Sequence, residues 1–539
     1  MIGPMRRLRA SWSGTSLRPT WWRGIMIGLP VILVLAAAAS ASSPNRQQLS
    51  PRSTSNPQLA LATATASHPS LLAVNGRGTA VVTATDNGHV GVIARTRGGV
   101  WSPVRWFNAP TPIYRKRGGS AQVMALPTGR FLVFWEDSRP RSTPLLTSIG
   151  SSDGRTWSTP RLLTPASGTV VGSETAALPD AVVDGKGNVT VVWLRQLASS
   201  FQLQAAVYRG AANSWTSPVD VGDCGCQRGS ESAANFAIAE NANGEVFARW
   251  QELIDKGSSS YFVTHAALEL APGRWTRLPP LNETTTRPAV APDGAFLLGL
   301  EDQKTFANGG FVPVGEKIIR AAGDGKSWED DADFAPAQGA LLSAGSIQLA
   351  SGPGGEVEAS WAQTKPTAFV LAFRDAGGNW STPAPLSALN GGINGGGALT
   401  FISSDRLLGL MEGNTNPNNI YSVSLHALLI QISAARLQST STLSRAMFGH
   451  TELVQPGSTT VFWKDVNLKN VAETTTAVRS ATWVAGQTAP RLGTICRCKL
   501  FPGRAAAGGG TEVLTDGGYI AYRDGSDAAW KLYAGPAAH

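Results

Sequence analysis

Four cysteines are the residues whose spacing points most directly to chemistry. They form two Cys-x-Cys pairs, Cys224 with Cys226 and Cys496 with Cys498. In an exported protein four thiols are expected to be oxidised, so two disulfides are the first interpretation. A disulfide closed within one pair would be strained and easily reduced, which leaves a redox role or a pairing between the two motifs open. The sharper alternative is a four-thiolate zinc or copper site, although Cys-x-Cys is a weaker zinc signature than Cys-x-x-Cys.

Other metal and cofactor signatures are lacking in the sequence. The six histidines show no ligand spacing. There is no glycine-rich phosphate loop that opens a helix, no G-x-S-x-G elbow and no H-E-x-x-H motif. We therefore expect no cofactor and assign no metal.

Arginines are the candidate ligand-binding residues. A guanidinium group matches a carboxylate with two parallel hydrogen bonds, so arginine is the side chain suited to acidic ligands. Five candidates lie in or beside the long loops described below: Arg117, Arg139, Arg195, Arg228 and Arg287. Arg523 is a sixth arginine that could reach the face formed by these loops.

Acidic residues recur two positions after a series of buried strand ends. They are Asp137, Glu252, Asp302, Glu412, Asp465 and Asp524. Neighbouring carboxylates such as Glu136 and Asp137 could serve general acid–base catalysis. A feature repeated through most units is more economically a hydrogen-bond acceptor that braces a loop. Arg195 and Gln363 break this pattern and are candidates for specialisation.

The elements that position these residues are short strands. Past residue 60, alternating apolar segments recur between Gly, Asn, Asp and Pro turns, with almost no helical periodicity. One series of landmarks is a tight turn followed by a strand that ends in an aromatic residue or Leu, as in KGNVTVVW, NGEVFARW and GGEVEASW. A second series is a turn followed by Trp, as in SSDGRTW and APGRW. The spacing of about 50–60 residues predicts one four-stranded propeller blade per unit.

The number of blades follows from the tight turns between the first two strands of each unit. There are nine such turns, from Gly78 to Gly517, and the last unit is truncated soon after Trp530. A propeller ring is commonly closed by a split blade, and the segment LALATATA at 59–66 could supply the missing strand. The sequence thus predicts an all-β fold, a single β-propeller of four-stranded blades. We favour eight blades, with seven and nine as alternatives.

Strands A to D of each unit leave two unlike faces. The A–B and C–D connections are tight Gly turns, whereas the B–C and D–A connections include long charged loops such as EDSRPRST and KDVNLKNVAET. Loops that vary between otherwise uniform repeats usually carry binding. We therefore expect the functional face to be the one with the B–C and D–A loops.

The first residues form a targeting segment. Five arginines precede an apolar run from Gly24 to Ala39 and the sequence Ala39-Ser40-Ala41, which predicts a signal peptide over 1–41 or an uncleaved signal-anchor. Residues 42–58 are expected to be a flexible leader and 59–539 the propeller. Without the five arginines the net charge of +9 falls to about +4, spread along the chain, so we expect no nucleic-acid partner.

The segment Ser151 to Trp157, SSDGRTW, resembles the Asp-box of the sialidase-like BNR-repeat propellers, in a form one residue shorter. GDGKSW and AGGNW look like degenerate copies at the same hairpin. The resemblance implies a propeller in which this box is a structural turn remote from the active site. Sialidases similar to this fold use three arginines, a Tyr–Glu pair and an acidic Asp. No such arrangement is evident here, so no catalytic residue is transferred.

Two functional hypotheses follow from the sequence. The first is a secreted or cell-surface, non-catalytic propeller that binds an extracellular protein or glycan through its B–C and D–A loops. The alternative is a glycoside hydrolase of the sialidase-like superfamily. We favour the non-catalytic hypothesis, because fold alone does not define activity. A monomer is expected, with membrane contact only if the signal is uncleaved.

Overall fold

The computed structural model describes residues 71–534, all within one unit of the chain, Ser55–His539, with internal gaps. The gaps are 87–88, 108–120, 137–144, 165–168, 171–178, 197–200, 224–235, 256–259, 284, 306–310, 335–340, 343–346, 353–355, 366, 376, 387–397, 404, 415–422, 433–435, 456–457, 466–476, 498–503, 509, 516–518 and 526–527. The segment 59–66 and both N-terminal segments therefore lie outside the described residues. Within the described part, no helix is long and apolar enough to cross a membrane.

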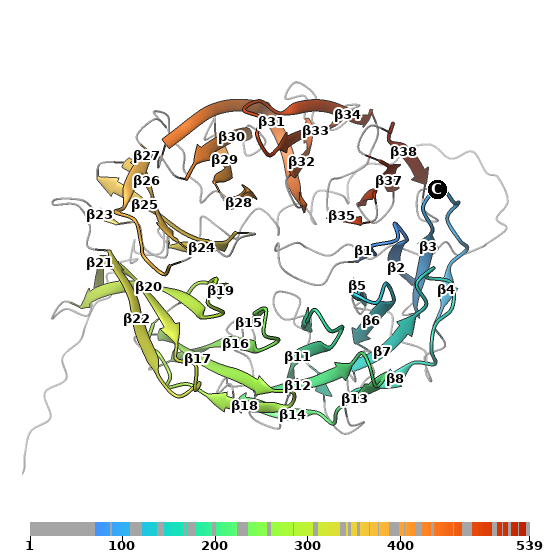
Figure 1. Ribbon diagram of the computed structural model, residues 1–539, viewed down its shortest axis with the longest axis horizontal. Helices are drawn as coiled ribbons and strands as arrows, with labels where there is room; N and C mark the ends of the chain where they lie inside the picture. The colour runs from blue at the N-terminus through green and yellow to red at the C-terminus, as the bar shows by residue number, and fades with distance from the viewer. Residues whose placement is uncertain are drawn as a thin grey trace, which may run out of the picture. The chain divides into compact units, whose positions relative to one another are not determined.

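Antiparallel four-stranded blades follow one another around a ring (Figure 1). Blades 1 and 2 consist of β1 (Leu72–Val74), β2 (Ala80–Asp86), β3 (His89–Arg95), β4 (Arg105–Trp106), β5 (Ala121–Ala125), β6 (Phe131–Glu136), β7 (Leu145–Gly150) and β8 (Arg161–Leu162). Blade 3 consists of β9 (Thr169–Val170), β10 (Asp180–Val183), β11 (Val189–Gln196), β12 (Phe201–Arg209), β13 (Ser214–Trp215) and β14 (Val219–Asp223).

Blades 4 to 6 repeat the same order of strands. Blades 4 and 5 consist of β15 (Phe236–Glu240), β16 (Val246–Asp255), β17 (Ser260–Ala271), β18 (Arg274–Arg277), β19 (Ala289–Val290), β20 (Phe296–Thr305), β21 (Phe311–Ala321) and β22 (Trp328–Phe334). Blade 6 consists of β23 (Leu341–Leu342), β24 (Gln348–Ser351), β25 (Val357–Lys365), β26 (Thr367–Arg374) and β27 (Ala384–Leu386).

Blades 7 and 8 share one long strand. Blade 7 is β28 (Ala398–Ser403), β29 (Arg406–Asn414), β30 (Val423–Gln431) and the first half of β31 (Arg436–Gln455). The second half of β31 is the inner strand of blade 8, followed by β32 (Ser458–Asp465), β33 (Ala477–Val484) and β34 (Arg491–Arg497). Blade 9 is β35 (Arg504–Gly508), β36 (Thr511–Thr515), β37 (Tyr519–Asp524) and β38 (Lys531–Ala534).

The propeller of four-stranded blades is confirmed, but the preference for eight blades is wrong, because the structure has nine. The error lies in the last unit. Tyr522 belongs to β37, the third strand of blade 9, and not to a second strand. The A–B turn of this blade is therefore at Gly508 to Gly510, upstream of Gly517, and the unit is short but complete. Blade 9 supplies its own four strands, so the ring needs no split blade.

Each Trp landmark packs in the layer between two blades. Phe107 of blade 1 stacks on Trp135 of blade 2 with ring centroids 5.0 Å apart, and Phe334 of blade 5 stacks on Trp361 of blade 6 at 5.2 Å. The edges of these two phenylalanines meet the Trp that follows the C–D turn, as in Trp157. Buried aromatic pairs of this kind hold adjacent blades together, which is why the landmarks recur once per blade.

The Asp-box is the C–D turn of blade 2, as expected from the sequence. The Oδ1 atom of Asp153 accepts the backbone N–H of Arg155 at 3.1 Å, and the indole N–H of Trp157 donates to the Gly154 carbonyl at 2.8 Å. Gly154 has φ of 68°, and a Cβ there would lie 2.7 Å from the side chain of Ala94 in blade 1. The turn is therefore a structural contact between blades.

The seam between blade 9 and blade 1 closes the ring (Figure 1). Arg95, at the end of β3, forms a two-pronged ion pair with Asp524, at the end of β37. Asp524 also accepts the Thr511 hydroxyl at 2.9 Å and the backbone N–H of Gly98 at 3.1 Å, while the Arg95 guanidinium lies 4.1 Å from the centre of the Tyr522 ring. Charged and aromatic contacts thus join the first and last blades.

Candidate functional site

Most of the arginines and cysteines predicted from the sequence lie outside the described residues. This applies to Arg117, Arg139, Arg228, Cys224, Cys226 and Cys498. Arg195, Arg287 and Cys496 are described, and the structure places them in three different blades. Cys496 lies half-buried within β34. The sequence had placed it after the end of this strand, so that expectation is wrong. The pairing of the cysteines stays a prediction.

Arg195 and Arg287 are not brought together. Arg195 lies at the loop end of β11, where it pairs with Val170 of β9 and Gln202 of β12. Side chains alternate along a strand, so Arg195 lies on the same side of β11 as Trp193, whose ring packs between blades 2 and 3. Its Nε is buried, with no hydrogen-bond partner in the described part of the chain. Arg287 instead precedes β19 of blade 5.

Arg287 belongs to a buried charged cluster with Asp180 and Arg249. Asp180 opens β10 and Arg249 lies in β16; both are almost completely buried, while Arg287 is half-buried. Burial raises the pKa of Asp180 to about 7, although the nearby Arg287 opposes this. Burial, together with the charge of Arg287, lowers the pKa of Arg249 to about 10. The three side chains come from blades 3, 4 and 5 and interact beneath the loop-bearing face.

A pocket of about 300 Å³ lies where blade 3 meets blade 4, at the end of β14 from which a D–A loop leaves. We call it the loop-face pocket. Its lining residues are Asp223, Trp250, Glu252, His265, Ala266, Arg277 and Leu278. It lies on the side of the ring that the sequence indicated as functional.

Charged groups of both signs line the loop-face pocket in pairs. The imidazole Nε2 of His265 and the carboxylate of Glu252 are 2.9 Å apart. A guanidinium nitrogen of Arg277 is 3.6 Å from the carboxylate of Asp223. Asp223 and Arg277 are more than half exposed, whereas Glu252 and His265 are partly buried. The pocket therefore offers hydrogen-bond donors and acceptors with no large excess of either charge.

Trp250 forms the base of this pocket. Its ring is buried and stacks on the His265 imidazole with centroids 5.6 Å apart, and its indole N–H donates to the Asp223 carbonyl at 3.3 Å. Gly222 lies directly against it, since a Cβ there would be 2.3 Å from the Trp250 ring. The absence of a side chain at Gly222 lets blade 3 approach blade 4 closely enough to form the pocket.

Blade 8 carries the same pattern of residues as blade 4, but its acid has different hydrogen-bond partners. Trp463 and Asp465 correspond to Trp250 and Glu252, and Arg479 pairs across from Trp463 as His265 pairs across from Trp250. Asp465 accepts the Trp463 indole N–H at 2.9 Å and the Arg479 Nε–H at 2.8 Å. The acid that recurs two positions after the landmark is thus hydrogen-bonded in both blades, but its partners lie on strands and not in the loop that it was predicted to brace.

Sequence reasoning missed Asp180, Asp223, Arg249, His265 and Arg277. His265 could have been found from the hairpin register, because it lies opposite Trp250 on the neighbouring strand. Arg277 follows two residues after the landmark Trp275. Asp223 comes from the preceding blade, so its approach depends on the packing of two units and leaves no pattern within either one.

Comparisons with known proteins yielded distant structural matches only. No family model and no curated protein matches the chain. A lectin from Burkholderia pseudomallei is similar to it with a TM-score of 0.36 and 14% identity over 70% of this chain and 98% of the lectin. A PL25 ulvan lyase bound to a sugar fragment gives 0.36 and 11% over 76% and 92%. The NanB sialidase from Streptococcus pneumoniae gives 0.31 and 11% over 75% and 83%.

The fold and the turn at Asp153 define the chain as a nine-bladed β-propeller with an Asp-box turn. The resemblance to sialidase-like propellers stays one of sequence motif, to which the NanB match adds a distant likeness of fold only. At these identities the matches concern the type of fold and do not identify a ligand for this chain.

Proposed function

We propose that this chain is an exported, non-catalytic β-propeller that binds a glycan through its loop-bearing face at blades 3 to 5. The observation that carries the proposal is the loop-face pocket, in which Glu252, His265, Asp223 and Arg277 line about 300 Å³ above Trp250. A sugar presents hydroxyl groups that both donate and accept hydrogen bonds. Paired charges of opposite sign suit such a ligand better than a ligand of one charge.

The cluster at Arg287 extends this binding face toward the inner strands. Its half-buried guanidinium lies near Asp180, which takes up a proton near neutral pH, and can then donate to an acidic group such as a uronate or a sulfate ester. The proposal thus includes acidic glycans among the ligands. Export is inferred from the predicted signal over 1–41, and the other loop arginines, Arg117, Arg139 and Arg228, stay candidates for the same face.

The test uses the exported chain and a panel of immobilised neutral and acidic glycans. Glu252→Gln keeps the shape of the side chain and removes its charge, so we expect affinity for the bound glycan to fall about tenfold, the cost of about 1.5 kcal/mol for a charge-assisted hydrogen bond. Asp465→Asn is the matched control, because it makes the same change at the equivalent position of blade 8, away from the pocket.

Equal affinities of the Glu252→Gln and Asp465→Asn variants would contradict the proposal. So would a panel in which no glycan binds. In the second case the protein-ligand form of the hypothesis would be tested with the same pair of variants, since the location of the pocket does not depend on the ligand class.

A second function, glycoside hydrolysis, is favoured by one observation. The pKa of Asp180 is raised by burial to about 7, which is the range of a carboxylic acid that donates a proton near neutral pH. The measurement is turnover of a panel of fluorogenic glycosides across about pH 4 to 9. Hydrolysis that is lost in Asp180→Asn would support this function, and no turnover in the native protein would remove it.

A further inference from the structure

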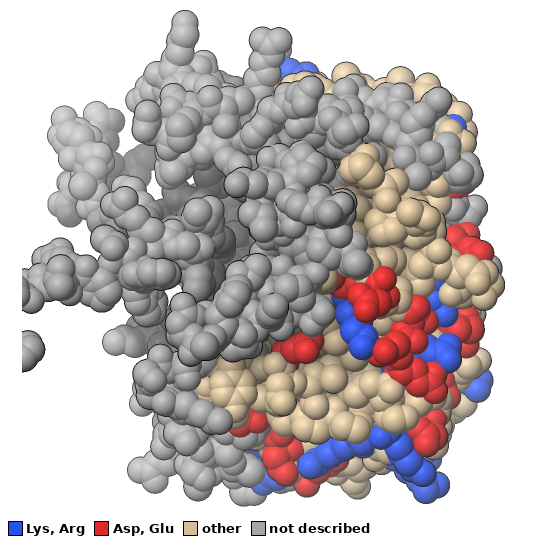
Figure 2. All heavy atoms as spheres, turned by 90° about the vertical axis from the view of Figure 1, so that its left-hand side faces the viewer, with Lys and Arg blue, Asp and Glu red and all other residues tan. Residues whose placement is uncertain are grey.

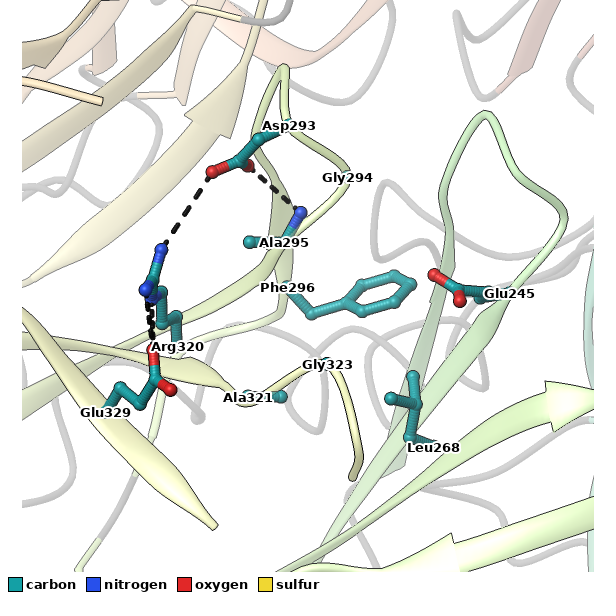
Figure 3. A pocket seen from close by; sticks show the side chains of 10 residues that line it. All are labelled: Glu245, Leu268, Asp293, Gly294, Ala295, Phe296, Arg320, Ala321, Gly323 and Glu329. Atoms are coloured by element: carbon teal, nitrogen blue, oxygen red, sulfur yellow. Dashed lines mark hydrogen bonds and ion pairs between the residues drawn. The ribbon is translucent and has the colours of Figure 1, made fainter. Parts of the chain in front are cut away.

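A second pocket opens on the opposite face of the ring, between the tight turns of blades 4 and 5 (Figure 3). We call it the turn-face pocket. It has a volume of about 280 Å³ and no part in the proposed glycan site. The residues used below are Glu245, Leu268, Asp293, Phe296, Arg320, Gly323 and Glu329, which all line it.

The floor of the turn-face pocket is apolar. Phe296 and Leu268 belong to the buried cluster between blades 4 and 5, and each exposes only 2–3% of its surface. Figure 3 shows the Phe296 ring reaching across the pocket toward the blade 4 turn that carries Glu245. An aliphatic group that enters the pocket would therefore contact carbon atoms at its base.

Carboxylates outnumber cations around this floor. Glu329 is held by Arg320 of the same blade, with the Arg320 Nε at 2.7 Å. Asp293 is 4.0 Å from Arg320 and 3.3 Å from Arg374, which also pairs with Asp331. The lining contains three carboxylates and a single arginine, which is already engaged by Glu329 (Figure 3).

Glu245 is the carboxylate whose charge is not balanced. It lies in the A–B turn of blade 4, and its Oε2 accepts the side-chain N–H of Asn241 at 2.6 Å. Among the described residues it forms no ion pair. Glu245 therefore faces the apolar floor with an acceptor available for a cation.

The strand beside the pocket is rich in acidic residues, most of which are paired with cations. The outer strand of blade 5, β22, reads WEDDADF and carries Glu329, Asp330, Asp331 and Asp333 within seven residues. Figure 2 shows this side of the molecule, where acidic side chains gather among basic ones. Because Glu329, Asp330 and Asp331 pair with Arg320, Lys317 and Arg374, this strand adds little net charge, and Glu245 is the acid that distinguishes the pocket.

We propose that the turn-face pocket binds an ammonium or guanidinium group on a short aliphatic stem, as presented by a lysine or arginine side chain of a partner protein. The stem lies on Phe296 and Leu268, and the cation pairs with Glu245. The carboxylate of Asp293 lies at the same pocket, but its Oδ1 accepts the Ala295 backbone N–H and its Oδ2 faces Arg374. This site differs in ligand charge from the loop-face pocket and is independent of the glycan proposal.

The probes are agmatine and n-butylamine, with n-butanol as the uncharged counterpart, and binding is followed by ligand-observed NMR on the full chain. Both amines are expected to bind and to compete with each other, and n-butanol is expected to bind at least about tenfold more weakly, the difference of a lost charge-assisted hydrogen bond. Glu245→Gln is expected to lower the affinity for agmatine about tenfold, because it removes the same charge-assisted hydrogen bond.

Gly323 supplies a second, steric test. An added Cβ at Gly323 meets no atom within 4 Å, so Gly323→Leu can fill the pocket from its wall without backbone strain. Gly76 has the same open surroundings on a turn of blade 1, which makes Gly76→Leu the matched control. Agmatine binding should be lost in Gly323→Leu and unchanged in Gly76→Leu.

Three results would overturn the proposal. The first is native protein that does not bind either amine. The second is n-butanol binding as tightly as n-butylamine, and the third is agmatine binding that survives both Glu245→Gln and Gly323→Leu. If Gly323→Leu fails to fold, the Glu245→Gln comparison decides alone. Glu252→Gln should leave agmatine binding intact, which separates this site from the glycan site.

Discussion

The seam between blades 9 and 1 and the loop-face pocket between blades 3 and 4 both place arginine next to carboxylate at a junction of blades. At the seam, Arg95 is buried and Asp524 accepts hydrogen bonds from four donors. In the pocket, Arg277 and Asp223 are more than half exposed and 3.6 Å apart, beside open space. The carboxylate that closes the ring is saturated with donors, whereas the charges that line the pocket keep hydrogen-bonding capacity in reserve.

The largest effect that this comparison predicts is on stability at the seam. Asp524→Ala leaves the buried Arg95 guanidinium without its carboxylate, so we expect the free energy of unfolding to fall by about 3–5 kcal/mol. Asp223→Ala removes an exposed partner and should cost less than about 1 kcal/mol. Chemical denaturation of the two variants measures both values. Equal losses would mean that the seam is no more tightly held than the pocket.

Glu358 tests what a buried carboxylate does without an arginine. It lies in β25 at 1% exposure, with neither oxygen in a hydrogen bond of normal geometry, and the nearby Ser360 hydroxyl offsets little of the cost. Burial raises its pKa to about 8 from 4.5, so the folded state holds a proton that the unfolded state has released. Its stability contribution is full below about pH 4.5 and is lost as the pH rises toward 8.

The variant Glu358→Gln removes this titration. At pH 7 it should raise the free energy of unfolding by about 3 kcal/mol and flatten its decline between about pH 5 and 8. Urea denaturation at several pH values gives the comparison with the native chain. A native stability that does not decline over this range would show that Glu358 is ionised and balanced in the folded protein.

The pKa of Asp524 shifts in the opposite direction to that of Glu358. The Arg95 hydrogen bonds hold its pKa at about 2, below the usual 3.8, so the folded state favours the ionised carboxylate. The resulting stabilisation is present above about pH 4 and is lost as the pH falls through 2, with a size of about 2 kcal/mol. Acid unfolding should therefore be shallower in Asp524→Asn than in the native chain. The same slope in both would assign the acid sensitivity to other carboxylates.

The fold was largely predictable because each blade repeats its own core. Trp135 and Trp361 mark second strands in the sequence and occupy equivalent buried places in the structure. The number of blades was not predicted correctly, because Tyr522 resembles a second-strand landmark but lies in the third strand of the last blade. The short β35 and β36 give too little alternation to reveal the true turn.

The sites were less predictable than the fold because they form between units. The turn-face pocket joins Glu245 of blade 4 to Asp293 and Arg320 of blade 5, and Asp180 interacts with Arg287 from two blades away. A repeat pattern shows which side of a strand a residue occupies. It does not show which residue of the next blade stands opposite, since that depends on the packing of the inter-blade layer.

The smallest effect on stability is expected from making blade 4 resemble blade 8. His265→Arg places a guanidinium opposite Trp250 and next to Glu252, as Arg479 stands opposite Trp463 and next to Asp465. The new pair is partly exposed, so the free energy of unfolding should change by less than about 0.5 kcal/mol. The longer side chain fills part of the loop-face pocket, so glycan binding should fall at least about tenfold. Unfolding and glycan-binding measurements on one preparation separate the two effects. A variant that kept its affinity would place the glycan elsewhere on the face, whereas one that lost several kcal/mol would show that His265 serves the ring and not the ligand.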